Sequence, residues 1–195
     1  LKEMIEGHYR GPLDLEFVFN SEYERKNGIS LLAAGPWVDE EYVLIMADHV
    51  LDDQIMRATT EVQPPEQGAI LFVDHKVDEV FDLEDATKVQ ESVGRVQHIG
   101  KDLTRYNAVD TGVFIGTPGL LRALQEIREL RGDASLTEGV QRLADEGRMG
   151  TVDIQDAFWQ DVDDPAMLER AEALLKEKRE GAQGDSKGYV PPESM

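Results

Sequence analysis

Short runs of consecutive apolar residues alternate along the chain with stretches in which apolar residues recur every three or four positions. Runs of the first kind predict β-strands over residues 15–19, 42–47, 69–73, 112–116 and 151–154. The run at 42–47 (YVLIMA) is the most apolar and is bounded by acidic residues, which favours a strand buried on both faces of a parallel sheet. Residues 87–99 predict a hairpin with its turn at 92–94 (SVG).

Stretches of the second kind predict helices over 28–38, 52–58, 118–130 and 135–147, and a last helix from 165 onward. The 118–130 stretch carries an apolar stripe at three- and four-residue spacing. Ser135 and Glu138 form a capping box that begins the next helix. Gly35-Pro36 closes the first helix, and Pro165 stands where a helix commonly begins.

Strands that alternate with helices predict an α/β fold, a three-layer α/β/α sandwich around a mostly parallel mixed sheet. We expect one domain over 1–178. Residues 179–195 are rich in Gly, Ser, Pro and charge, which indicates a disordered tail or a linker. Because ligands of open α/β sheets sit at the carboxyl ends of strands, the residues after each strand are the first place to look for a site, notably Asn20, Asp48-His49 and Asp74-His75.

Charge and cysteine content narrow the functional classes. The 195 residues include 40 acidic and 20 basic side chains, a formal net charge of −20, and no cysteine. This surface would repel phosphate backbones, so nucleic acid is not an expected partner. No apolar run reaches membrane length and no signal peptide is present, so we expect a cytoplasmic protein. A solubilised cytosolic surface and an adaptation to high salt both explain the acidity, and composition does not choose between them.

Carboxylates that follow strands are the strongest candidates for chemistry. Asp48 follows the 42–47 run directly, where it suits a metal ligand or an acid–base group, and equally a cap of the next helix. His49 beside it is more typical of a structural imidazole. Asp161 and Asp163 alternate along an extended segment and would point the same way, whereas Asp164 before Pro165 is a natural helix cap. Two such loops could meet around Mg²⁺, which favours carboxylates.

Lys101 is a rare cation within an acidic region, which suits either a phosphate-binding lysine or an exposed surface lysine. It does not belong to a P-loop, because Gly94 and Gly100 enclose five residues where four are required, and Asp102 replaces Ser or Thr. The common dinucleotide, serine-hydrolase and zinc-protease motifs are absent from the sequence.

Taken in order, several segments resemble nucleotidyltransferases with the glycosyltransferase-A-like fold. These segments are 20–31 (NSEYERKNGISL), 43–49 (VLIMADH), 110–114 (DTGVF) and 159–165 (WQDVDDP). A further segment, 82–89 (DLEDATKV), together with Lys101 and Tyr106, resembles the CTP:inositol-1-phosphate cytidylyltransferase branch. The resemblance extends over 20–175, and its specificity comes from the order and spacing of motifs that are individually weak.

The resemblance implies a site and a reaction. Asp48, Asp161 and Asp163 would bind Mg²⁺, with Asp48 and Lys101 acting in catalysis and Lys101 holding the acceptor phosphate. Asn27 and Ser30 would lie near the nucleotide, and Asp110, Thr111 and Gly112 would line the acceptor pocket. An acceptor phosphate oxygen would attack the α-phosphorus of a nucleoside triphosphate, which the branch implies is CTP, and pyrophosphate would leave. The alternatives are a sugar-1-phosphate nucleotidyltransferase using another nucleotide, and a non-catalytic remnant or binding module.

One departure from the family pattern concerns the glycine-rich loop that cradles the triphosphate. Leu32-Ala33-Ala34-Gly35 matches its first letters, but Pro36-Trp37-Val38 break the pattern and the position along the chain is wrong. The resemblance therefore implies a chain that lacks the first strand and the loop. Members of this branch are also found fused to a membrane-embedded transferase domain, and the tail at 179–195 suits either a linker to such a domain or a free terminus.

Overall fold

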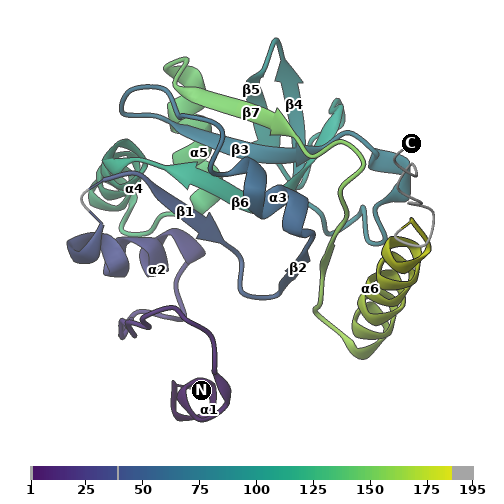
Figure 1. Ribbon diagram of the computed structural model, residues 1–195. Coiled ribbons are helices and arrows are strands. Elements are labelled where there is room, and N and C mark those ends of the chain that lie inside the picture. Colours follow the sequence, from purple (N-terminus) through teal and green to yellow (C-terminus); the bar gives the residue numbers. More distant parts are fainter. Residues whose placement is uncertain (1, 39, 186–195) are drawn as a thin grey trace, which may run out of the picture.

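The computed structural model describes residues 2–38 and 40–185 (Figure 1). Its centre is a six-stranded sheet with the order β1-β6-β3-β7-β5-β4, and two short strands pair separately as a β2–β8 ribbon. The strands are β1 (Tyr42–Ile45), β2 (His49–Leu51), β3 (Ala69–Asp74), β4 (Lys88–Ser92), β5 (Arg95–Gly100), β6 (Ala108–Gly116), β7 (Met149–Asp153) and β8 (Trp159–Asp161).

Most predicted helices are present, and their caps explain where they begin. The capping box at Ser135 and Glu138 is confirmed. Thr117 caps the start of the helix at 118–131, where its side chain accepts a hydrogen bond from the Gly119 N–H. No helix within the described residues is long and apolar enough to cross a membrane. The helices are α1 (Lys2–His8), α2 (Asn27–Ala34), η1 (Gly35–Trp37), α3 (Asp53–Ala58), η2 (Val77–Glu79), α4 (Pro118–Arg131), α5 (Leu136–Asp145) and α6 (Pro165–Asp185).

The sheet is buried on both faces because its central strands are apolar throughout. Along β3, Leu71 and Val73 face a core that α2, α4 and α5 cover, whereas Ile70 and Phe72 face a second core beneath α3 (Figure 1). This alternation follows from the two-residue period of a strand. The predicted α/β class with three layers and a mixed sheet is therefore confirmed.

The expected predominance of parallel strands is wrong. Among the described strand pairs, β3–β7 is parallel, and the other pairs of the sheet are antiparallel. The reason is that β6 lies between β1 and β3 and runs opposite to both. The strand at 42–47 is also not buried on both faces, since β1 lies at the edge of the sheet with Val43 43% and Ile45 38% exposed.

A further prediction is corrected near the start of the chain. Residues 15–19 are irregular rather than a strand, because no described strand lies beside them to complete the hydrogen bonds that a strand requires. At the other end, α6 extends past residue 178 to Asp185, as the helix-forming Lys, Glu and Arg residues there allow. Residues 186–195 of the predicted tail lie outside the described residues.

The packing of α2 against the α4–α5 turn gives a test of the fold. A Cβ at Gly28 would lie 2.6 Å from the Ala134 carbonyl oxygen and 2.9 Å from Leu124. Gly28→Ala should therefore lower the free energy of unfolding by about 1–3 kcal/mol, measured by denaturant unfolding. The matched control is Gly7→Ala in α1, where a Cβ meets nothing within 4 Å and the change should stay within about 1 kcal/mol. Equal effects of the two substitutions would contradict this packing.

Candidate active site

The β2–β8 ribbon brings two acidic segments together that are distant in sequence. His49 lies opposite Asp161 in the antiparallel register, and Leu51 lies opposite Trp159. The pairing continues past the strands, because the Val162 N–H donates to the Asp48 carbonyl oxygen at 2.8 Å. The carboxylates of Asp48 and Asp161 thus lie on two backbone segments that are hydrogen-bonded to each other.

A cleft of about 250 Å³ opens beside this ribbon. It is lined by side chains from several elements that the sequence places far apart. Those that carry chemistry are Asn27, Asp48, His49, Asp85, Thr87, Lys101, Asp110, Thr137, Trp159, Asp161 and Asp163, with Gly112 between them. The structure therefore gathers most of the predicted site residues in one cavity.

The Asp48 carboxylate is half-exposed and held by its neighbour in the chain. His49 Nδ1 lies 2.8 Å from Asp48 Oδ1, and the imidazole stacks on the Trp159 indole with ring centres 5.5 Å apart and an interplanar angle of 14°. Gly112 leaves room for that ring, since a Cβ there would lie 2.8 Å from His49. Its φ of 73° also favours glycine.

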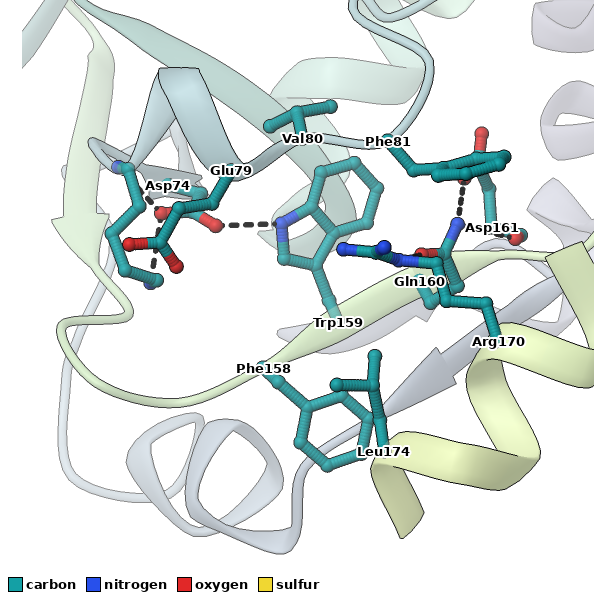
Figure 2. A pocket seen from close by; sticks show the side chains of 11 residues that line it. Asp74, Glu79, Val80, Phe81, Phe158, Trp159, Gln160, Asp161, Arg170 and Leu174 are labelled. Atoms are coloured by element: carbon teal, nitrogen blue, oxygen red, sulfur yellow. Dashed lines mark hydrogen bonds and ion pairs between the residues drawn. The ribbon is translucent and has the colours of Figure 1, made fainter. Parts of the chain in front are cut away.

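Asp161 is held by its neighbour in β8, Gln160 (Figure 2). Gln160 Nε2 donates to Asp161 Oδ1 at 2.8 Å, and Arg170 Nε donates to Gln160 Oε1 at 3.2 Å. Arg170 lies over the Phe81 ring, 5.0 Å from its centre. Burial raises the pKa of Asp161, an effect that nearby His49 opposes.

This donor set suits a hard divalent cation. Asp48 and Asp161 offer carboxylate oxygens from paired strands, and Asp163 lines the same cleft. In the part of the chain that the structure describes, no three His, Asp or Glu side chains are grouped to hold a metal by themselves. Mg²⁺ is commonly held by one or two carboxylates and completes its shell with water and substrate phosphates, so two carboxylates fit it.

Lys101 and Asp110 line the same cleft. Lys101 Nζ forms an exposed ion pair with Asp85 Oδ1 at 2.8 Å. Asp110 Oδ1 accepts from the Gly112 N–H at 2.8 Å. Burial raises the Asp110 pKa to about 6, while that hydrogen bond and nearby His49 act in the opposite direction. The cleft thus offers one exposed cation and one carboxylate that titrates near neutral pH.

Two predicted residues do not line this cleft, and a third has a further role. The Thr111 hydroxyl is buried and donates to the Phe72 carbonyl at 2.7 Å, within the sheet. Ser30 accepts from Asn20 Nδ2 at 3.0 Å and lines a neighbouring, more apolar pocket. Asn27 lines both cavities, and its Oδ1 accepts from the Leu136 N–H at 2.9 Å at the start of α5.

Comparison with known proteins finds relatives along nearly the whole chain. A bifunctional IPC transferase and DIPP synthase from Thermococcus kodakarensis is 33% identical over 97% of this chain and 40% of its own length. One of the same name from Aquifex aeolicus is 28% identical over 83% of this chain and 35% of its own length. The chain thus spans about 40% or less of these relatives. No family model matches it.

Solved structures extend the similarity to the fold. The inositol-1-phosphate CTP transferase from T. maritima matches with a TM-score of 0.69 and 29% identity, over 80% of this chain and 64% of that one. By sequence and by fold, this chain is similar to nucleotidyltransferases. A candidate glucose-1-phosphate thymidylyltransferase from Bacillus anthracis shares the fold at 18% identity, with a TM-score of 0.60 over 74% of this chain and 58% of that one.

Sequence reasoning assigned no role in this cleft to His49, Trp159 or Asp85. Two local signals were available for the first two. His49 directly follows Asp48, and Trp159 stands two residues before Asp161, so both side chains of that pair point to one face of a strand. Asp85 stands within the 82–89 segment, but its contact with Lys101 joins residues 16 positions apart, which the sequence did not indicate.

Burial of Asp110 in the cleft predicts a pH-dependent instability. The folded state raises the Asp110 pKa from 3.8 to about 6, so it favours the protonated carboxyl. The resulting contribution to stability is fully present below pH 3.8 and is lost as the pH rises through 6. Asp110→Asn should therefore be more stable than the wild type by about 1–3 kcal/mol at pH 8, and the difference should shrink toward pH 4. Urea unfolding across this range measures it. Asp78→Asn, at an exposed acid in η2, is the control, and a pH-independent difference for Asp110→Asn would contradict the assignment.

Proposed function

We propose that the protein is a Mg²⁺-dependent cytidylyltransferase, which transfers CMP from CTP to inositol-1-phosphate and releases pyrophosphate. The observation that carries the proposal is the convergence of Asp48 and Asp161 with Lys101 and Asp110 in one cleft. The names of the relatives support the choice of CTP and of an inositol phosphate.

The acidic residues of the ribbon would hold the metal. Asp48 and Asp161 would be its ligands, with Asp163 as a third candidate on the same loop. When bound, Mg²⁺ supplies positive charge against the triphosphate, which the acidic cleft itself lacks. His49 and Gln160 meanwhile fix the two carboxylates by the contacts described above.

The acceptor would lie toward Lys101. An exposed ion pair contributes no more than about 1 kcal/mol, so a dianionic phosphate competes readily with Asp85 for the lysine. Once displaced, Asp85 can accept hydrogen bonds from polyol hydroxyls, as can the ionised Asp110 carboxylate. One cation flanked by two carboxylates suits a phosphate ester of a neutral polyol.

The proposed reaction needs positioning and charge neutralisation more than proton transfer. A phosphate monoester is a dianion above its second pKa of about 6. Its oxygen therefore attacks the α-phosphorus of CTP without losing a proton; a new P–O bond forms while the bond to the β-phosphate oxygen breaks. The pyrophosphate leaves with that electron pair. This balance explains why a cleft with one lysine and several carboxylates suffices.

The decisive experiment measures pyrophosphate release by the full natural polypeptide from CTP with inositol-1-phosphate, and with hexose-1-phosphates and other nucleotides in parallel. Asp48→Asn should lower kcat/KM at least about 100-fold, because it removes a metal ligand at the transferred phosphate. Asp78→Asn should leave the rate unchanged. Release with hexose phosphates alone would favour a sugar nucleotidyltransferase, and release with no pair would favour a binding module.

The role of Lys101 is separable from that of the metal. Lys101→Gln should raise the KM for inositol-1-phosphate about 10- to 100-fold, because a charged hydrogen bond to the phosphate is lost, and should change the KM for CTP little. Lys2→Gln, at an exposed lysine of α1, is the matched control. An equal rise in both KM values would place Lys101 at the nucleotide instead.

A further inference from the structure

A second cavity of about 100 Å³ is lined by Asp74 of β3, by Trp159 and the other residues of β8, and by Arg170 of α6 (Figure 2). Trp159 lines both the cavity and the cleft, so its indole forms part of the wall between them. On the cavity side, the indole Nε1–H donates to Asp74 Oδ2 at 3.0 Å. The Asp74 carboxylate is buried, with an exposed fraction of 4% for the residue.

Asp74 is fixed independently of the ribbon. It is the last residue of β3, at the carboxyl end of a fully buried central strand. Its Oδ1 accepts from both the backbone N–H and the Nζ of Lys76, each at 2.8 Å. Lys76 Nζ also donates to the Ala157 carbonyl at 3.2 Å and to the Gln155 carbonyl. The acceptor for the indole is thus part of the rigid sheet.

On the other side, the indole sets the place of His49. The stacked imidazole is only 14% exposed, and Gly112 leaves the space that it occupies. Its Nδ1 bonds to Asp48, whose own carboxylate is 54% exposed and therefore has few other constraints. The contacts form one line from the sheet to the cleft: Asp74, Trp159, His49, Asp48.

Packing alone does not account for a buried acid at this point. Lys76 compensates the burial of this carboxylate at Oδ1, and the second oxygen, Oδ2, accepts from the indole N–H. A hydrogen bond to the indole nitrogen adds what apolar packing cannot, namely a fixed angle for the ring. That angle determines how the ring presents its face to His49.

We propose that Asp74 and Trp159 are positioning residues, which hold the Asp48 carboxylate, through His49, in the orientation that binds the divalent metal. The inference rests on the proposed function, since it takes Asp48 as a metal ligand. Neither residue touches the substrates or the metal in this proposal. Their effect on metal affinity resembles that of outer groups in other metal sites, which is about 10- to 100-fold.

The test measures the binding of Mn²⁺, a probe for the divalent site, to the full natural polypeptide in the presence of CTP. Electron paramagnetic resonance detects the bound and the free Mn²⁺. Trp159→Phe keeps a ring for stacking but removes the N–H donor, and it should weaken Mn²⁺ binding about tenfold. Asp74→Asn keeps an oxygen acceptor for the indole and should weaken it less. Trp37→Phe, at a tryptophan that is 60% exposed, should change nothing.

A double-mutant cycle shows whether the effect passes through His49. In a His49→Gln background, Trp159→Phe should change the Mn²⁺ affinity less than about twofold, because the link to Asp48 is already broken. A second readout needs no metal. The proton NMR signal of the His49 ring, identified by its loss in His49→Gln, should move when Trp159→Phe alters the stacked ring.

The outcomes separate this inference from the proposed function. Unchanged Mn²⁺ affinity in both Trp159→Phe and Asp74→Asn, with affinity lost in Asp48→Asn, would overturn the inference and leave the metal site standing. A lower melting temperature without a change in Mn²⁺ affinity would show a purely structural role and overturn it equally. If the wild type bound no Mn²⁺ through Asp48, the metal site would fail and the inference with it.

Discussion

The pairing of β2 with β8 is the interaction on which the candidate site depends. Each strand has only three residues, and a ribbon of that size is not stable by itself. Its stability comes from the groups around it. Asp52 is buried at its end, where its N–H donates to the Phe158 carbonyl at 3.1 Å and its carboxylate pairs with Lys178 of α6. Through this support, two carboxylates that lie 113 residues apart in sequence numbering, Asp48 and Asp161, come to face one cleft.

The cleft, like the chain as a whole, has more acidic than basic side chains. Five aspartates line it against one lysine, Lys101, and the proposed anionic substrates would meet the same sign of charge. Burial raises the pKa of Asp110 and of Asp161, which shows that the protein environment opposes their ionised forms. A bound divalent cation would relieve this repulsion and attract the triphosphate at once. The net charge of −20 is thus compatible with polyanionic substrates only where a cation mediates the contact.

Sequence patterns predicted the elements whose stability is local. The Ser135 capping box and the hairpin turn, where Val93 and Gly94 both have positive φ, are confirmed because neighbouring residues determine them. Strand direction was not predictable in this way, since it depends on which strand β6 lies beside. The 15–19 run failed for the same reason: its apolar residues suit a strand, but a strand exists only with a partner.

In the candidate site, too, the sequence predicted some features and not others. The family resemblance pointed to Asp48, Asp161 and Lys101 because each stands within a short motif, and the structure places all three in the cleft. Thr111 stands in such a motif too, yet its hydroxyl belongs to the sheet, because a strand turns alternate residues away from the cleft. Asp74 follows a strand and Trp159 begins the 159–165 motif, so each has a local signal of its own. The two residues are 85 positions apart, however, and the hydrogen bond between them exists only in the folded chain. Local patterns can thus indicate single residues of a site, whereas the contacts between those residues depend on the fold.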